Sequence, residues 1–169
     1  RKRTHRRAPR IRTFPTSKEV KLTGFAGYKV GMTHVMAIET NKNSHMKGDE
    51  ISIPVTIIEC PPIKIKSVKL YKKSDNRIVV AKETVKFQEI KPEEYVDLRV
   101  NVVTQPSLTG IGKKKGEVIE MSLGGNSVSD KLKFVIDNFG KELSFENIFS
   151  EGELVDVKSF SKGKGFQGP

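Results

Sequence analysis

The sequence is poor in the residues that build metal sites, disulfides and membrane spans. Its 169 residues include one cysteine, Cys60, three histidines and no tryptophan. A single cysteine excludes an intrachain disulfide and a cysteine cluster for zinc, and the histidines lack the spacing of metal ligands. No apolar run approaches the roughly 18 residues of a membrane span, and no apolar signal core follows the basic N-terminus. We therefore expect an intracellular protein with no metal, cofactor or membrane partner.

Groups that would carry catalysis are also missing. No Ser–His–Asp or Cys–His combination stands out in the sequence. Cys60 ends the apolar stretch ISIPVTIIEC, where a buried and inert thiol is expected. The neighbouring acids Glu93 and Glu94 fall in a polar stretch that is typical of solvated surface. We expect neither enzymatic activity nor a small-molecule substrate.

Positive charge, in contrast, is abundant and is concentrated at the two ends of the chain. The formal net charge is +11. Residues 1–21 carry nine Lys and Arg against one Glu, and residues 158–169 carry three Lys and no acid. These two ends account for the whole excess, so residues 22–157 are balanced. The distribution predicts a neutral globular body with extensions that bind a polyanion.

The opening stretch RKRTHRRAPRIRTFPTSKEV has no amphipathic period, and Pro9 and Pro15 interrupt any helix. It predicts an extended basic arm over residues 1–21 that is ordered only on its partner. Six arginines and one lysine precede Thr13, and guanidinium groups suit phosphate better than ammonium groups do. A solvated tail or a localisation signal is the alternative interpretation.

The body reads as a series of short strands. Strand-like stretches cover residues 22–33, 34–40, 51–60, 63–71, 77–87, 99–106, 116–123 and 152–160. Pro54 inside an apolar stretch favours an edge strand, a bulge or a strand start, and residues 74–76 favour a turn. Residues 91–98 suggest a short helix after Pro92. Short strands at this spacing are typical of an antiparallel barrel or sandwich.

One longer helix is expected near residues 127–139. Apolar residues recur there at the spacing of one helix face: Leu132, Val135, Ile136 and Phe139. Ser127 and Asp130 form a capping-box pattern, and Gly140 is a natural stop. This helix is expected to be an inserted or appended element that packs on the barrel.

A lysine run interrupts the balanced body between Gly112 and Gly116. Residues 113–115 are all lysine, and the flanking glycines predict a flexible loop. A contact with phosphate and a solvated hairpin tip are both consistent with this pattern.

The closing stretch SKGKGFQGP contains the spacing G-x-G-x-x-G over residues 163–168. A dinucleotide loop needs a helix beyond its third glycine, whereas here Pro169 follows directly. Lys162 and Lys164 place cations on backbone thin enough to follow a phosphate ridge, which favours nucleic-acid contact. Phe166 stacks on a base or anchors the loop in the core, and both interpretations stay open.

Five blocks of sequence carry a family resemblance. They are PRIRTFP at 9–15, GFAGYKVGMTHV at 24–35, IPVTIIECPP at 53–62, EGELVDV at 151–157 and KGKGFQGP at 162–169. Together they resemble the ribosomal protein L3 family of the large subunit in its archaeal and eukaryotic-like form. The blocks follow the family's order and span nearly the whole chain, which makes the resemblance specific.

The resemblance implies a mainly β fold, a translation-protein-type six-stranded β-barrel with an inserted α/β portion and basic extended termini. It implies binding to large-subunit ribosomal RNA, contacts with neighbouring large-subunit ribosomal proteins, and a role in subunit assembly and around the peptidyl transferase centre. It also implies a place in the cytoplasmic ribosome and no catalytic residue. Because the family continues into a basic half that bears tryptophan, this chain is expected to be a fragment.

We expect three parts: a basic arm at residues 1–21, a β-barrel body at 22–160, and an RNA-contacting loop at 161–169. The predicted contacts with ribosomal RNA lie in the arm, the lysine run and the final loop. They are Arg1, Lys2, Arg3, Arg6, Arg7, Arg10, Arg12, Lys113, Lys114, Lys115, Lys162, Lys164, Phe166 and Gln167.

Overall fold

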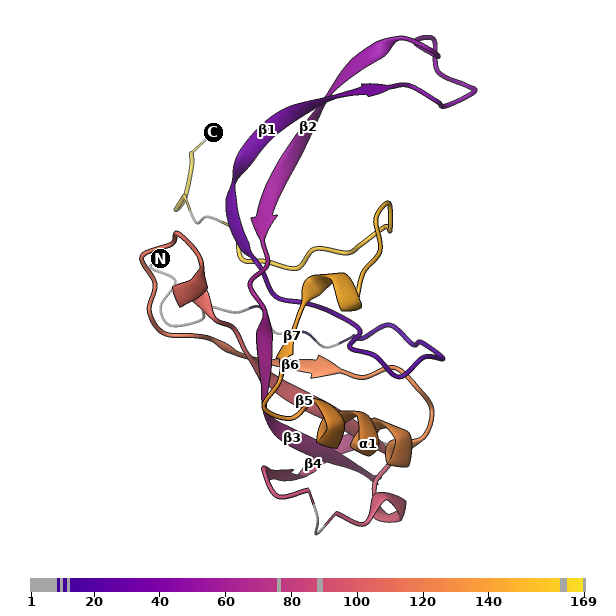
Figure 1. Ribbon diagram of the computed structural model, residues 1–169, viewed down its shortest axis with the longest axis vertical. Helices are drawn as coiled ribbons and strands as arrows, with labels where there is room; N and C mark the ends of the chain where they lie inside the picture. Colours follow the sequence, from indigo (N-terminus) through magenta and orange to yellow (C-terminus); the bar gives the residue numbers. More distant parts are fainter. Residues whose placement is uncertain are drawn as a thin grey trace. The chain divides into compact units, whose positions relative to one another are not determined.

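A computed structural model describes residues 9, 11, 13–75, 77–87, 90–161 and 164–168 (Figure 1). The chain divides into two compact units. One is Gly27–Cys60, and the other combines Arg1–Ala26 with Pro61–Pro169. Each unit has its own antiparallel sheet.

The unit Gly27–Cys60 is a long hairpin of two strands, β1 (Tyr28–Ile38) and β2 (Glu50–Glu59) (Figure 1). One continuous strand, β1, replaces the two strands expected on either side of residue 33. In the described residues β2 pairs only with β1, so Pro54 lies in an edge strand, which is one of the three positions that the sequence left open.

The hairpin exposes many of its apolar side chains to solvent. The exposed set is Val30, Met32, Val35, Met36, Ile38, Ile53, Ile57 and Ile58. Close backbone approach occurs at Gly27, where a Cβ atom would collide with the side chains of Ile58 and Cys60. The alternating apolar pattern thus produces strands here without producing a buried core.

The second unit is built on a five-stranded sheet. Its strands run in the order β4 (Arg77–Thr84), β3 (Ile63–Ser74), β5 (Asp97–Val103) and β6 (Val118–Ser122), and β7 (Glu142–Leu143) also pairs with β3. The predicted turn after residue 74 is confirmed, because Ser74 pairs with Arg77 and Asp75 takes a φ of 42°.

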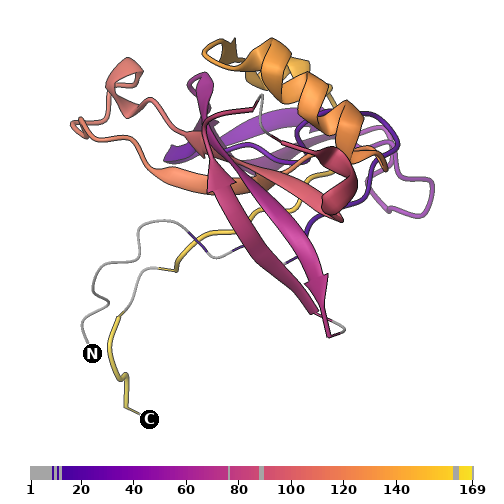
Figure 2. The ribbon, with the colours of Figure 1, turned by 90° about the horizontal axis from the view of Figure 1, so that it is seen from below.

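Helix α1 (Val128–Asn138) lies against this sheet (Figure 2). Ser127 is its N-cap residue as predicted, but the Ser127 side chain makes no capping hydrogen bond. The helix stops before Gly140, whose φ is 80°. The buried stripe is centred on Val135 and includes Lys131, which leaves Ile136 at the edge of the stripe and 51% exposed.

The remaining regular structure in the described part of the chain consists of three short 3-10 turns. They are η1 (Pro92–Glu94), η2 (Pro106–Leu108) and η3 (Phe145–Asn147). The helix expected over residues 91–98 is therefore only one turn, because β5 begins at Asp97 and Leu98 is fully buried in the sheet.

The core lies on one face of the five-stranded sheet. Its buried members are Leu22, Ile63, Ile65, Val68, Leu70, Leu98, Val100, Val102, Met121, Leu123, Val135, Leu143 and Ile148. Strand register explains why these residues meet, since Val68 lies opposite Val100 and Leu70 opposite Leu98. Each fully buried side chain of this kind stabilises the fold by roughly 1.5–3 kcal/mol.

The opposite face of the same sheet is polar. Register places Ser67 opposite Asn101 and Lys69 opposite Arg99 on this face. We call the following set the polar face: Ser67, Lys69, Tyr71, Glu83, Arg99, Asn101 and Glu120. Ser67 and Asn101 are buried and share the Glu83 carboxylate through hydrogen bonds of 2.6 and 2.7 Å.

The expectation of a mainly β fold with antiparallel sheets is confirmed. No closed six-stranded barrel is found in the described residues, where β4 and β6 end the larger sheet, so the barrel stays a prediction. The strand expected at 152–160 is wrong, because residues 153–160 have no strand pairing. Leu154 is 98% exposed. The alternating apolar residues of this segment have no neighbouring strand with which to pair.

Candidate nucleic-acid interface

The predicted contacts of the basic arm lie outside the described residues. They are Arg1, Lys2, Arg3, Arg6, Arg7, Arg10 and Arg12, and Lys162 of the final loop lies outside as well. The structure does describe the segments to which both basic ends are attached.

Residues 13–23, which we call the arm root, lie along the end of β6. Backbone amides join the two segments: Gly125 donates to the Ser17 carbonyl at 2.7 Å, Gly124 to the Lys21 carbonyl at 2.8 Å, and Thr23 to the Ser122 carbonyl at 3.1 Å. Leu22 and Leu123 form an antiparallel bridge, and both are buried in the core. The expectation that the arm is ordered only on its partner is therefore wrong for residues 13–21.

Two glycines make this close approach possible. A Cβ atom at Gly124 would collide with the Glu19 carbonyl oxygen, and one at Gly125 would collide with the Val20 side chain. Gly125 also has a φ of 91°, a conformation that other residues rarely adopt. Because the Glu19 carbonyl belongs to the backbone, a side chain at 124 would have to displace the arm root itself.

At its outer end the arm root is held by an aromatic and cationic stack. The guanidinium carbon of Arg99 lies 4.8 Å from the centre of the Phe14 ring and 4.3 Å from that of the Tyr71 ring. Phe14 belongs to the arm root, whereas Arg99 and Tyr71 belong to the polar face. Cation–π contacts of this kind contribute about 0.5–2 kcal/mol each.

The guanidinium of Arg99 is also part of a connected set of ion pairs. Arg99 donates to Glu120 at 3.1 Å and to Asp97 at 3.3 Å. Glu120 accepts from Lys69 at 2.8 Å, and Asp97 accepts from the buried ammonium of Lys131 on α1 at 2.8 Å. Three cations therefore share two carboxylates, and these cations are occupied in holding the fold.

The pKa values of this network follow from its contacts. Burial disfavours the Glu120 carboxylate, but hydrogen bonds from Lys69, Tyr71 and Arg99 outweigh burial and hold the Glu120 pKa below its usual value. Burial and the 2.5 Å hydrogen bond that Tyr71 donates to Glu120 raise the pKa of Tyr71 to about 12. The ionised Glu120 and the neutral Tyr71 thus stabilise each other.

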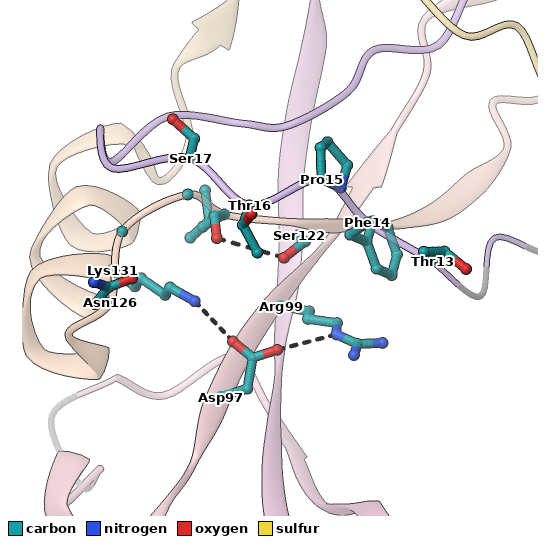
Figure 3. Close-up of a pocket in the computed structure, with 13 residues that line it drawn as sticks. Thr13, Phe14, Pro15, Thr16, Ser17, Asp97, Arg99, Ser122, Asn126 and Lys131 are labelled. Carbon is teal, nitrogen blue, oxygen red and sulfur yellow. Dashed lines mark hydrogen bonds and ion pairs between the residues drawn. The ribbon is translucent and has the colours of Figure 1, made fainter.

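A polar pocket of about 330 Å³ lies where the arm root crosses the sheet (Figure 3). Thr13, Phe14 and Thr16 line it from the arm root, and Arg99 and Lys131 line it from the sheet and the helix. Figure 3 shows the Lys131 and Arg99 side chains reaching Asp97 from two sides. Both cations near the pocket are therefore paired within the protein.

The lysine run at residues 113–115 contains three lysines in different surroundings. The ammonium of Lys113 is paired with the Glu117 carboxylate. Lys114 and Lys115 are exposed. A Cβ atom at Gly116 would collide with the Thr104 carbonyl, so this glycine is needed for close packing of the loop. Lys114 and Lys115 are accordingly better placed than Lys113 to contact an external anion.

The final loop is exposed over its described residues, 164–168. Phe166 is 95% exposed, which excludes the interpretation in which this ring anchors the loop in the core of the described structure. Lys164 and Gln167 are exposed as well, and Gly165 has a φ of 75°. No strand precedes this stretch over 153–161 and no helix lies within 164–168, so a dinucleotide loop is not formed in the described residues.

A hydrogen bond joins the two segments that lead to the basic ends. The ammonium of Lys158 donates to the Thr13 carbonyl at 3.2 Å. Thr13 is the first residue of the arm root, and Lys158 precedes the final loop by a few residues. No local sequence pattern indicates this proximity, because the two residues are 145 positions apart.

The described residues offer little support for a metal site, a reactive thiol or a membrane-spanning helix. Within those stretches, no three His, Cys, Asp or Glu side chains are grouped in a way that would hold a metal ion. The thiol of Cys60 is partly buried, and burial raises its pKa, which disfavours the reactive thiolate. Among the described helices, none has the length and apolar character needed to cross a bilayer.

Sequence reasoning missed the residues that hold the arm root: Phe14, Asp97, Arg99, Glu120 and Lys131. Alternation within β5 was the available signal. Asp97, Arg99 and Asn101 alternate there with buried Leu98 and Val100, and a strand that alternates charge with core residues needs polar partners on its second face.

Comparison with known proteins gives consistent matches over the whole chain. The family described as Ribosomal protein L3 matches residues 1–79 and 69–169. A relative from Methanosphaera stadtmanae, described as "Large ribosomal subunit protein uL3", is 40% identical over 194 aligned residues that cover 100% of this chain and 58% of the relative.

Two further relatives bear the same description. The protein from Archaeoglobus fulgidus is 40% identical over 192 residues, covering 100% of this chain and 58% of the relative. The protein from Methanopyrus kandleri is 37% identical over 194 residues, covering 99% of this chain and 54% of the relative. The chain therefore spans little more than half the length of these curated relatives.

Proposed function

The chain belongs to the ribosomal protein L3 family, and on this basis we propose that it is a structural component of the large ribosomal subunit. In this proposal it binds large-subunit ribosomal RNA through its basic ends and has no catalytic role. It also contacts neighbouring ribosomal proteins, supports subunit assembly and the architecture around the peptidyl transferase centre, and works in the cytoplasmic ribosome. The relatives are described as proteins of the large subunit, which supports the assignment.

The segregation of charge is the observation that carries the RNA-binding part of the proposal. Residues 1–21 and 158–169 account for the whole net charge of +11. The cations of the sheet near the arm root are paired with Asp97 and Glu120. The surplus charge is therefore confined to the ends, which leaves the ends as the parts suited to phosphate.

The proposed RNA contacts are those predicted from the sequence, and the structure favours some of them over others. In the lysine run, Lys114 and Lys115 are stronger candidates than Lys113, because Lys113 is already paired. In the final loop, the full exposure of Phe166 supports stacking on a base. The contacts of the arm are proposed on charge and position alone.

The six-stranded barrel is part of this proposal too. Both strands of the hairpin carry exposed apolar side chains that a closed barrel would bury. We expect closure in a protein of the relatives' length, of which this chain spans about 58%.

The test is binding to a large-subunit ribosomal RNA transcript at several salt concentrations. Each phosphate contact contributes about 0.9 to the slope of log affinity against log salt on duplex RNA and about 0.7 on single strands. Replacing the two predicted lysine contacts of the final loop, Lys162 and Lys164, by glutamine should therefore lower the slope by about 1.4 to 1.8. The matched control changes two exposed lysines of the body to glutamine, Lys73 and Lys82, and should change the slope much less.

Two outcomes would contradict the proposal. Binding that is insensitive to salt would exclude contacts led by phosphate. Equal loss of ribosomal RNA binding to a duplex DNA competitor would favour a general cation effect over recognition of RNA, because A-form RNA is recognised by its shape and 2′-hydroxyl groups.

A further inference from the structure

We infer that the free edge of β1 is a docking site for a second copy of this chain, with the two β1 strands antiparallel about a twofold axis at Val35. The pairing joins two hairpins edge to edge into one four-stranded sheet and leaves the faces of that sheet open. It goes beyond the proposed RNA-binding function and does not depend on it, because the surplus positive charge lies outside the hairpin.

The first step is that β1 has an edge that can still form hydrogen bonds. Among the described residues β1 pairs only with β2. The Glu39 amide donates to the Asp49 carbonyl at 3.1 Å, and the Glu39 carbonyl accepts from the Gly48 amide at 3.0 Å, so both groups face β2. The direction of backbone groups alternates along a strand, and the register is regular from Gly31 to Ile38. The residues whose backbone groups face away from β2 are therefore Met32, His34, Met36 and Ile38.

The second step is that the free edge of β2 is less suited to such pairing. Register places Pro54 opposite His34, so the Pro54 nitrogen faces away from β1. Proline has no amide hydrogen to donate, and it therefore interrupts that edge near its middle. Glu50 and Glu59 lie at the two ends of β2, and they would meet as like charges if two β2 strands paired in antiparallel. The edge of β1 is the open one.

The third step is that the edge of β1 is complementary to itself. A residue with outward backbone groups must meet another such residue, so the antiparallel register can change only in steps of two. The register with Val35 opposite its own copy pairs all four outward residues of the regular stretch. It places Met32 opposite Ile38 and His34 opposite Met36 of the second copy. Met32 and Ile38 are 65% and 64% exposed, and apolar side chains on neighbouring strands stabilise a pairing of this kind.

Opposite charges meet at the ends of the paired strands. In this register Gly31 lies opposite Glu39 of the second copy, and the exposed Lys29 follows closely. The bulge between Lys29 and Gly31 shortens β1, so Lys29 lies about one residue, roughly 3.3 Å, beyond Gly31, and its side chain spans that distance. The twofold axis gives two such ion pairs. The hairpin itself carries three lysines and four acids, which favours a protein strand over RNA on this edge.

The experiment measures the mass of the full chain by sedimentation equilibrium over a range of concentrations. At about 0.15 M salt the Debye length is about 8 Å, which screens the repulsion between the basic ends of two copies. The unaltered chain should pass from 18.9 kDa to twice that mass as its concentration rises. Met36→Pro should weaken dimerisation by about tenfold or more, because it removes an amide that faces the second copy and no bond to β2. Ser52→Pro is the matched control, since Ser52 lies opposite Met36 and its amide faces the other edge.

An exchange of charges is a second test and needs no proline in a strand. Lys29→Glu should weaken dimerisation about fivefold, because two exposed ion pairs become repulsive contacts. Combining Lys29→Glu with Glu39→Lys should restore most of the affinity. Lys141→Glu, an exposed lysine of the sheet unit, is the control and should leave dimerisation unchanged.

A cross-link tests the register. In a Cys60→Ser chain, Val35→Cys should be joined efficiently to its own copy by a short bifunctional maleimide, because opposite residues of this type lie about 4.5 Å apart. Ile38→Cys is the control, because its own copy lies six residues further along the pair, roughly 20 Å away. It should cross-link several-fold less.

Three outcomes would overturn the inference. A chain that stays at 18.9 kDa at every concentration would assign the β1 edge to a different partner. Equal cross-linking at Val35→Cys and Ile38→Cys would indicate aggregation without a defined register. Equal losses from Met36→Pro and Ser52→Pro would show that the edge of β2 is used as well. None of these outcomes affects the RNA-binding proposal, which the salt dependence of binding tests separately.

Discussion

The five-stranded sheet and the β1–β2 hairpin are built from similar residues but differ in what covers them. Ile63 in β3 is fully buried, whereas Ile38 in β1 is 64% exposed. The sheet has α1 against its apolar face, and the arm root adds Leu22 to the core and stacks Phe14 on Arg99 of the polar face. Alternation of β-branched residues therefore determines that strands form, and a second layer determines whether they are buried.

The largest loss of stability is expected when a buried isoleucine of the sheet is shortened, and this substitution tests the difference directly. Ile63→Ala should destabilise the protein by about 2–5 kcal/mol, because it removes buried methyl groups and leaves a cavity. Ile38→Ala, the same change in the hairpin, should alter stability by no more than about 0.5 kcal/mol. Urea unfolding followed by circular dichroism measures both. Equal losses would mean that the hairpin is buried in solution and that the comparison is mistaken.

The next largest loss of stability is expected at Gly124, where a substitution tests whether the arm root is docked. Gly124→Ala should destabilise by about 1–3 kcal/mol, because the added methyl group collides with the Glu19 carbonyl and must displace the arm root. Hydrogen exchange of the Gly125 amide, which donates to Ser17, should become faster. Gly31→Ala in the hairpin is the matched control, since nothing lies within 4 Å of a Cβ atom there. An unchanged exchange rate at Gly125 would show that the arm root is not docked.

A smaller effect comes from the polar face. Glu120→Gln should destabilise by about 1–2 kcal/mol near neutral pH, because Lys69 and Arg99 lose a charged partner that is only partly exposed. The lowered pKa of Glu120 gives the sign of the pH dependence: its contribution is complete above the ordinary glutamate pKa and is lost as pH falls through the folded value.

Unfolding of the two proteins between neutral and acidic pH measures this contribution. The difference between the native chain and Glu120→Gln should shrink as the medium becomes more acidic. Glu94→Gln is the control, because the Lys72–Glu94 pair is about half exposed and should matter little. A difference that stays constant down to strongly acidic pH would assign the effect to packing.

The smallest effect concerns Tyr71 alone. Its raised pKa of about 12 means that its stabilising contribution is present below the ordinary value near 10 and is lost as pH rises towards 12. The chain has three tyrosines and no tryptophan, so the ultraviolet absorbance of tyrosinate can be followed directly. Tyr71→Phe should remove the latest phase of that titration. Survival of this phase in the variant would assign it to another group.

Much of the sheet unit was predictable from sequence because its signals are local. The helix near 127–139 has a helical period and a glycine stop, and the structure has it at Val128–Asn138. The turn after residue 74 also depends on local backbone chemistry. These predictions required no knowledge of the partners of each strand.

The errors arose where structure depends on distant segments. Residues 152–160 have the alternation of a strand but lack a neighbouring edge, so the segment stays extended and exposed. The arm root is ordered by contacts with distant residues. Its backbone packs closely on Gly124, and its Phe14 ring stacks on Arg99. The alternation of β5 indicates a polar face but does not identify the partners of its charged residues, which are Lys69, Glu120 and Lys131.

The unpaired edges of the β1–β2 hairpin affect how the free chain behaves in solution. In the described residues β1 and β2 pair only with each other, so each keeps one flank of backbone amides and carbonyls without a strand beside it. Such flanks, next to exposed isoleucine and methionine, are templates for aggregation with other copies. We therefore expect a free chain to self-associate through this hairpin, and to do so more strongly as its concentration rises.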